Sequence, residues 1–207
     1  TGLMEIERLV AGVYAANCYL VYEGGRGFIV DPGGQADKIS RKIEELGFKP
    51  EFILLTHGHV DHIGAVEDLR NMYTIPVLIH EDDGPMVEDR DLNLSNMMPS
   101  ADACFKADKT FKDGDILYPD EFDIKVLHTP GHTAGGSCFI IGDSILTGDT
   151  LFKGSVGRTD LATADPDQMV KSLKKLKGLD EKLLVYPGHG AETTIGEEKK
   201  SNQFLNK

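Results

Sequence analysis

The order of apolar patterns along the chain limits the folds open to it. Residues 51–55 form a short, largely apolar run typical of a buried strand. A helix pattern over 35–47, with apolar side chains three and four residues apart, precedes this run, and another over 66–73 follows it. Residues 76–79 form the next buried strand. This β-α-β order predicts an α/β fold.

Strand and helix patterns continue on both sides of this region. They comprise strands at 16–23, 27–31, 124–127, 137–141, 144–146 and 183–186, a helix from the N-cap Asp165 to Gly178, and a closing helix over 194–205. Two sheets covered by helices, a layered α/β sandwich, fit this pattern. With no repeat or linker, we expect one domain over 1–207, with the acidic and then Asn- and Met-rich segment 81–110 as a lid.

Composition excludes several classes of protein. The 207 residues are 40% hydrophobic and 27% charged, which excludes coiled-coil, collagen-like and wholly disordered chains. A net charge of −12 repels phosphate backbones and anionic lipid. The apolar runs are far shorter than the ~20 residues that cross a bilayer, and the first residues lack a secretory signal pattern. We expect a cytoplasmic protein with no nucleic-acid or membrane partner.

The cysteines do not indicate a disulfide framework or a thiolate metal site. There are three, an odd number, and none has CxxC spacing. We expect small buried hydrophobic side chains at Cys18, Cys104 and Cys138.

A cluster of metal-binding side chains directly follows the strand at 51–55. Residues 56–62 read THGHVDH, which places four potential ligands within six residues. Buried imidazoles and carboxylates would each need a hydrogen-bond partner, so a mere packing role is disfavoured. In an extended loop His57 and His59 point the same way and can bind one ion, whereas Asp61 and His62 lie further on and can face a second.

Three later turns supply the remaining ligands, and in each a glycine precedes the ligand. The expected ligands are His57, His59 and His132 for one ion, Asp61, His62 and His189 for the other, and Asp149 as a bridge between them. Nitrogen and oxygen ligands without thiolate suit Zn²⁺, Fe or Mn. We expect two divalent ions, with Zn²⁺ ranked first.

The whole pattern resembles the metallo-β-lactamase superfamily, with its HxHxDH motif at 57–62 and the later His, Asp and His turns. The resemblance implies a four-layer αββα sandwich with a binuclear site at the sheet edges, and it assigns the same ligand roles residue by residue. Residues 17–19 (NCY), 31–34 (DPGG) and 148–152 (GDTLF) resemble the glyoxalase II branch.

Two other features are expected to be structural. His80 and His128 have no ligand counterpart in the family. The lysines of 171–177 are typical of a solvated helix face.

Two bound ions would favour hydrolysis. A divalent ion lowers the pKa of its water from 15.7 to about 7, so a hydroxide that bridges two ions is a nucleophile at neutral pH. The site stays positive where a carbonyl oxygen would become an oxyanion. We expect Asp61 to orient the hydroxide and pass its proton to the leaving group. A thiolate, with a parent pKa near ~8.5, leaves with little acid help.

Single residues separate the branches of the superfamily. By resemblance, His59 occupies a position that is Glu in the flavodiiron oxygen reductases, and Asp149 occupies one that is often Cys in the β-lactamases. Both residues therefore disfavour those branches. The net charge of −12 disfavours the nuclease branches. Hydrolysis of thioesters of the hydroxyacylglutathione type, hydrolysis of lactones, and oxygenation of sulfur remain.

The turn at 157–160 (GRTD) bears on this choice. Arg158 falls where glyoxalase II enzymes have a Lys or Arg that holds a carboxylate of glutathione. Asp160 replaces an aromatic residue of those enzymes and Gly190-Ala191 replaces Glu-Tyr, so the chain more closely resembles short bacterial glyoxalase II-like hydrolases. We expect Arg158 to bind a small anionic thioester, with S-lactoylglutathione first among candidates.

Two other activities stay open. Persulfide dioxygenases share the Gly-Arg-Thr-Asp turn and hold one Fe(II) by two His and one carboxylate, to which His57, His132 and Asp149 correspond by resemblance. A metal-binding module without catalysis is disfavoured, because an open binuclear site is an unusual way to build a merely structural one.

Overall fold

The computed structural model describes residues 4–98 and 102–206, which form two compact units. Unit 1 comprises the chain up to Ile79 together with Gly84–Thr110. Unit 2 comprises His80–Asp83 and the residues from Phe111 onward. The single domain over 1–207 stays a prediction, and each unit has its own sheet and helices.

Unit 1 is built on a six-stranded sheet in the order β1-β2-β3-β4-β5-β6. The first three strands are antiparallel neighbours, and β3, β4 and β5 run parallel. The elements from Glu5 to Phe111 are β1 (Glu5–Ala11), β2 (Ala16–Glu23), β3 (Arg26–Val30), α1 (Ala36–Leu46), β4 (Lys49–Leu54), α2 (Val60–Ile63), α3 (Val66–Tyr73), β5 (Val77–His80), η1 (Glu81–Asp83), α4 (Gly84–Val87), η2 (Ser95–Met97) and β6 (Lys109–Phe111). Of these, η1 belongs to unit 2.

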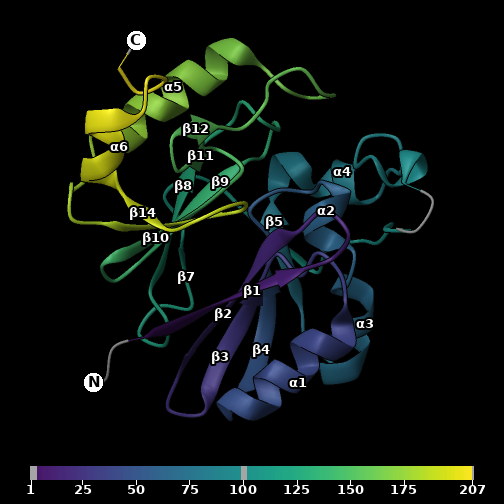
Figure 1. Ribbon diagram of the computed structural model, residues 1–207. Coiled ribbons are helices and arrows are strands. Elements are labelled where there is room, and N and C mark those ends of the chain that lie inside the picture. Colours follow the sequence, from purple (N-terminus) through teal and green to yellow (C-terminus); the bar gives the residue numbers. More distant parts are fainter. Residues whose placement is uncertain (1–3, 99–101, 207) are drawn as a thin grey trace. The chain divides into compact units, whose positions relative to one another are not determined.

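Helices α1 and α3 lie on one face of this sheet (Figure 1). Their apolar stripes are buried: Ile39 and Ile43 on α1, and Val66 and Leu69 on α3. These side chains share one core cluster with strand residues such as Ile53. The apolar residues spaced three and four apart in the sequence thus form the helix face that packs on the sheet. Burial of that face is the main favourable contribution to folding.

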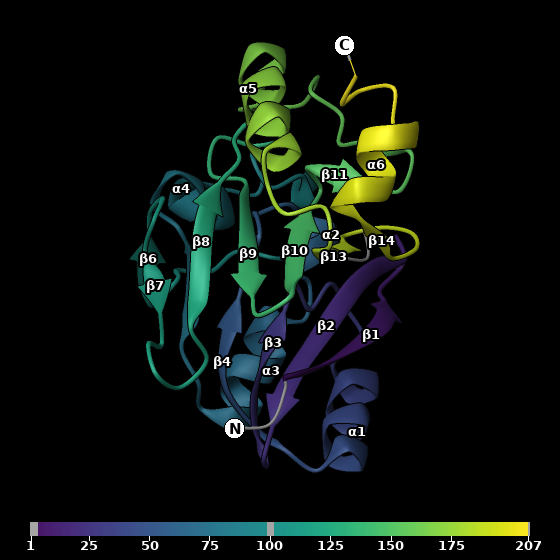
Figure 2. The same ribbon diagram turned by 90° about the vertical axis from the view of Figure 1, so that its left-hand side faces the viewer.

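Unit 2 has a second six-stranded sheet, in the order β14-β13-β10-β9-β8-β7. Figure 2 shows β8, β9 and β10 side by side, and these strands alternate in direction. The elements are β7 (Ile116–Leu117), β8 (Ile124–His128), β9 (Ser137–Ile141), β10 (Ser144–Gly148), β11 (Leu151–Phe152), β12 (Ser155–Val156), α5 (Pro166–Lys177), β13 (Leu184–Pro187), β14 (Thr193–Thr194) and α6 (Ile195–Ser201).

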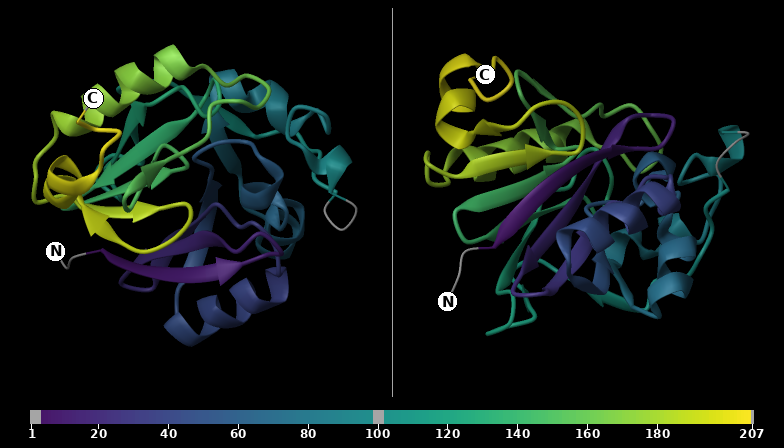
Figure 3. Two further views of the ribbon diagram at one scale, coloured as in Figure 1. Left: turned by 45° about the horizontal axis from the view of Figure 1, so that its top comes forward. Right: turned by 60° about the horizontal axis from the view of Figure 1, so that its bottom comes forward.

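Helices α5 and α6 lie on the same side of this sheet (Figure 3). The Asp165 carboxylate caps α5 by accepting hydrogen bonds from the backbone N–H groups of Asp167 and Gln168, at 2.9 and 3.2 Å. Leu173 of α5 and Ile195 of α6 pack in one core cluster with the strand residues of unit 2.

The predicted β-α-β order and the helix with its Asp165 cap are confirmed. Strand β1 was not predicted. The closing helix ends at Ser201 instead of Leu205, because the Asn202 side chain turns back to donate to the carbonyl of Ser155, at 3.1 Å. The lid over 81–110 stays a prediction, and within it Met86 and Phe105 are buried.

The cysteines of the described structure are free thiols. Cys18 and Cys138 are buried, as predicted, whereas Cys104 is partly exposed. Burial raises the pKa of Cys18 well above its usual range and that of Cys138 to about 12, so both stay protonated at neutral pH. Among the described residues, no helix is long and apolar enough to span a membrane.

Glu198 fixes α6 to its neighbours although its side chain is completely buried. Its carboxylate accepts hydrogen bonds from the Gly154 N–H at 2.7 Å, the Thr193 hydroxyl at 2.6 Å and the Asn202 amide at 3.1 Å. One carboxylate therefore holds together α6, the β11–β12 turn and the start of β14.

Replacement of this carboxylate should destabilise the fold. We expect Glu198→Ala to lower the free energy of unfolding by about 3 kcal/mol, because three donors lose a charged acceptor. Urea denaturation measures the change. Glu197→Ala, which removes an exposed carboxylate from the same helix, should change stability by less than about 1 kcal/mol. Equal losses in the two variants would contradict this role of Glu198.

Candidate metal centre

The THGHVDH segment of unit 1 forms the turn between β4 and α2 and the start of α2. His59 occupies the N-cap position, and Asp61 and His62 lie within the short helix. The N–H of Val60 donates to the carbonyl of Asn93 at 2.8 Å, which anchors the start of α2. The segment is thus a defined turn, with its ligand candidates at fixed positions.

Asp31, at the end of the neighbouring strand β3, orients two of these histidines. Its carboxylate accepts hydrogen bonds from the Thr56 N–H at 2.8 Å and from the Thr56 hydroxyl at 2.5 Å. The same carboxylate lies 2.9 Å from His62 Nδ1, and the Thr56 hydroxyl oxygen lies 3.1 Å from His57 Nδ1. Since the Thr56 proton goes to Asp31, the hydroxyl oxygen accepts from His57 Nδ1–H. Both imidazoles are therefore held as Nδ1–H tautomers with a lone pair on Nε2.

The candidate ligands of unit 1 lie close together. The ring centroids of His57 and His62 are 4.2 Å apart, and those of His57 and His59 are 5.0 Å apart. His62 Nε2 is 3.4 Å from a carboxylate oxygen of Asp61. The structure thus brings together all four side chains that the motif predicted for this unit.

Unit 2 brings its three predicted ligands together around one carboxylate. Nε2 of His132 and Nε2 of His189 each lie 3.4 Å from Oδ2 of Asp149. His132 donates from Nδ1 to the main-chain carbonyl of Arg158 at 2.8 Å, which directs its Nε2 lone pair toward Asp149. The buried Asp83 holds the loop around His132, since it accepts from the Thr133 hydroxyl at 2.8 Å and the Gly135 N–H at 2.7 Å.

In each unit a glycine lies directly against the main chain of an acidic candidate ligand. A Cβ on Gly33 would lie 1.9 Å from the Asp61 carbonyl oxygen, and one on Gly157 would lie 1.7 Å from the Asp149 carbonyl oxygen. Neither contact is compatible with a side chain. The backbone therefore approaches both acidic ligands more closely than any other residue would allow.

The other histidines make different contacts. His80 and His128 stack with ring centroids 4.0 Å apart. The Asp82 N–H donates to His80 Nδ1 at 3.0 Å, and His128 Nε2 donates to the Ala134 carbonyl at 2.9 Å. Burial, and then the neighbouring His128, lower the pKa of His80, so this ring is neutral at pH 7. The structural role expected for this pair stays a prediction.

The Arg158 side chain is exposed, with 62% of its surface accessible, and it is paired with Asp160. The two nitrogen–oxygen distances are 2.6 and 2.9 Å. This hydrogen-bonded pair lowers the pKa of Asp160. A substrate carboxylate would therefore have to compete with Asp160 for the guanidinium.

Three positioning groups were not predicted from the sequence. Asp31 was noted only as part of a turn, although a carboxylate at the end of a buried strand is the same signal that identified Asp149. Thr56 stood inside the motif without an assigned role. The Arg158 carbonyl is a main-chain group, and no residue type reveals it.

Comparisons with known proteins agree with this arrangement. A family model described as the metallo-beta-lactamase superfamily matches residues 11–189, which include every predicted ligand. The chain belongs to the metallo-β-lactamase superfamily. The α/β metallo-β-lactamase fold expected from the sequence is thereby confirmed, and its His and Asp side chains support binding of divalent metal ions.

Individual relatives refine this result. Hydroxyacylglutathione hydrolase GloC of Haemophilus influenzae is 38% identical over 210 residues, with 98% of this chain and 99% of the relative covered. The solved BLEG-1 B3 metallo-beta-lactamase has a TM-score of 0.93 and 34% identity, covering 98% of this chain and all of that one (100%). TTHA1623 in a di-iron-bound form has a TM-score of 0.88 and 36% identity, with 96% and 99% covered. The chain is thus a glyoxalase II-like member whose similarity also extends to a β-lactamase.

The Asp31 carboxylate should control the tautomer of His62. In the metal-free protein we expect His62 to carry its proton on Nδ1, and in Asp31→Ala we expect the Nε2–H form to gain population, because the acceptor is lost. Long-range ¹H–¹⁵N NMR distinguishes the two tautomers. Metal affinity should fall by about 10- to 100-fold.

Asp37→Ala, at an exposed carboxylate in the first turn of α1, is the matched control and should leave the His62 tautomer unchanged. A His62 that keeps its Nδ1–H form in Asp31→Ala would refute this role of Asp31.

Proposed function

We propose that this protein is a cytoplasmic, binuclear metal-dependent hydrolase of a small anionic thioester such as S-lactoylglutathione. The observation that carries the proposal is the orientation of His57, His62 and His132. Each has Nδ1 at an oxygen, so that Nδ1 carries the proton and Nε2 carries the lone pair that a metal ion requires. The 38% identity to GloC supports the thioester as substrate. The proposed ligands are His57, His59 and His132 for one ion, Asp61, His62 and His189 for the other, and Asp149 for both.

Ions bound by these residues would supply Lewis acidity, which polarises a carbonyl group and lowers the pKa of water. The all-nitrogen and oxygen donor set fits Zn²⁺, Fe or Mn, and the buried Cys18 and Cys138 stay protonated thiols. We keep Zn²⁺ as the first choice, with iron supported by the similarity to TTHA1623 in its di-iron form.

Asp61 is proposed as the group that moves a proton. Its side chain keeps 20% of its surface accessible, whereas that of its neighbour His62 is fully buried at 0%. A carboxylate at this boundary can orient a water molecule and transfer a proton to a leaving thiolate. Gly33 fixes the backbone of Asp61, so the carboxylate acts from a defined position.

Two alternatives have specific support. The first is oxygenation of a persulfide by one Fe(II) bound by His57, His132 and Asp149. The Gly-Arg-Thr-Asp turn, which persulfide dioxygenases share, supports it. Hydrolysis of a β-lactam is supported by the similarity to BLEG-1 B3 metallo-beta-lactamase. Lactone hydrolysis needs the same ions and the same Asp61, and it differs only in the substrate.

Metal content and the need for oxygen separate these activities. We expect two metal ions per chain by elemental analysis, and S-lactoylglutathione cleavage under argon at the same rate as in air. Asp149→Ala should lose metal and turnover together, because it removes a ligand of both ions. A content of one iron per chain, together with oxygen consumption when glutathione persulfide is the substrate, would refute the hydrolase proposal and support the dioxygenase. A higher kcat/KM for a lactone or a β-lactam would replace the thioester as substrate.

Arg158 is proposed to bind the substrate carboxylate. We expect Arg158→Ala to raise KM about tenfold with kcat nearly unchanged, because a lost ground-state contact of about 1.4 kcal/mol acts on binding alone. Asp160→Ala, which frees the guanidinium, should leave KM unchanged or lower it. Steady-state kinetics on both variants test this role, and an unchanged KM in Arg158→Ala would exclude it.

A further inference from the structure

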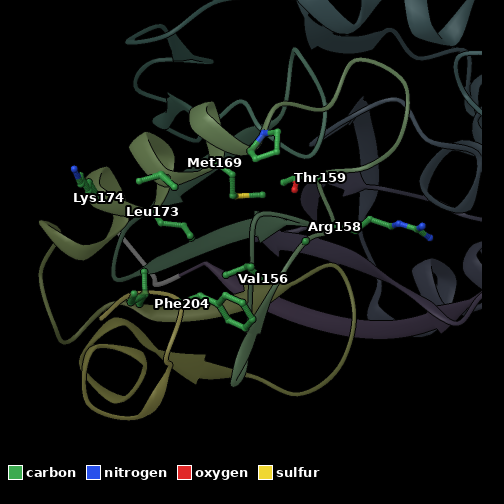
Figure 4. A pocket seen from close by; sticks show the side chains of 11 residues that line it. Val156, Arg158, Thr159, Met169, Leu173, Lys174 and Phe204 are labelled. Atoms are coloured by element: carbon green, nitrogen blue, oxygen red, sulfur yellow. The ribbon is translucent and has the colours of Figure 1, made fainter. Parts of the chain in front are cut away.

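Unit 2 contains a cavity that includes none of the proposed metal ligands. It has a volume of about 490 Å³ and lies between α5, the segment after β12 and the C-terminal residues Phe204 and Leu205 (Figure 4). Pockets for small molecules typically measure about 300–1,000 Å³. The cavity is therefore large enough for a ligand of about a dozen non-hydrogen atoms.

The walls of this cavity are apolar. Met169, Leu173 and Leu205 are buried and belong to the core cluster of unit 2, and Val156 and Phe204 pack against that cluster. At the rim Val170 is 53% exposed, although it is a large aliphatic side chain. The cavity is thus an opening into the hydrophobic core, where an aliphatic chain would find a well-packed environment.

The rim of the cavity carries a positive charge. The chain has a net charge of −12, yet four lysines lie between positions 171 and 177. Lys175 donates to the His128 carbonyl at 2.9 Å, whereas Lys174 lines the cavity and makes no ion pair with the residues of 4–98 and 102–206. A lysine near the C-terminal end of a helix also interacts favourably with the helix dipole. That interaction does not explain why Lys174 lies beside an apolar cavity.

The second cation of the rim is engaged elsewhere. Figure 4 shows Lys174 at one end of the cavity and Arg158 at the other, each with its charged group directed away from the labelled apolar side chains. Arg158 is paired with Asp160. Lys174 is therefore the cation available to a ligand in this cavity, and an amphipathic anion matches both the walls and the charge.

We propose that this cavity binds a carboxylate with an unbranched aliphatic chain, with the chain against Met169, Leu173 and Phe204 and the carboxylate at Lys174. On the α5 side the apolar lining residues are Met169, Val170 and Leu173, with no aromatic ring among them, and this wall favours a flexible aliphatic chain. The site is additional to the proposed metal centre, and its occupation does not depend on which reaction that centre performs.

Decanoate is a suitable probe, and its binding to the full, metal-loaded chain can be measured by isothermal titration calorimetry. We expect one site per chain with a dissociation constant of about 0.1 mM, typical of a ligand of this size. Acetate, which lacks the chain, and decyltrimethylammonium, which reverses the charge, should not bind. Failure of decanoate to saturate one site, or equal binding of decyltrimethylammonium, would overturn the proposal.

Variants on α5 locate the site. Lys174→Glu should weaken decanoate binding at least tenfold, because an attraction becomes a repulsion. Val170→Glu should have a similar effect at the exposed rim. Lys171→Glu makes the same change of charge on the same helix away from the cavity, so its affinity should stay within twofold of the unchanged protein. Equal losses in both lysine variants would indicate general attraction to the helix and refute the site.

The oligomeric state provides a further test. Sedimentation of the unchanged chain and of Val170→Glu shows whether a second copy covers the cavity. We expect the same state for both. A dimer that dissociates in Val170→Glu and does not bind decanoate would assign the cavity to contact between copies and overturn the ligand proposal.

Discussion

A single buried carboxylate organises the turn of unit 1 that carries the candidate metal ligands. Asp31 accepts hydrogen bonds from the main chain and the hydroxyl of Thr56, and it faces His62 Nδ1. A buried carboxylate is stable only with such donors, so the same bonds that make Asp31 tolerable inside the protein also fix the imidazoles. Through Thr56, the effect reaches His57 as well. The orientation of these two rings therefore follows from how strands β3 and β4 pair.

Unit 2 achieves a similar result with main-chain groups. The Arg158 carbonyl holds His132, and Gly157 allows that segment to lie against Asp149. Asp83 secures the other side of the same loop. Orientation by the main chain depends on the local fold more than on one side chain, so replacement of the Arg158 side chain leaves the carbonyl at His132 in place while it tests the proposed contact with substrate. This separation is what allows binding and metal affinity to be tested independently.

Much of the fold and of the candidate site could be predicted from the sequence. The spacing of apolar residues revealed α1, α3 and α5, because helix periodicity is local. The candidate ligands were visible because His and Asp at strand ends are chemically distinctive. Strand β1 was missed, since its pairing with β2 gives it stability that its own pattern, EIERLVA, does not reveal. The positioning roles of Asp31 and of the Arg158 carbonyl depend on contacts across 25 or more residues (25 from Asp31 to Thr56, 26 from His132 to Arg158), which no local pattern encodes.

The hydrogen bonds around Asp31 also determine at which stage the His57 and His62 rings become ordered. Because His57 and His62 are oriented by groups within unit 1, their loss of rotational freedom accompanies folding and not the arrival of a cation. A small zinc finger is unfolded until its metal arrives. Here hydrogen bonds within unit 1 orient both rings without an ion, so the entropy of ordering them is a cost of folding and not of ion binding.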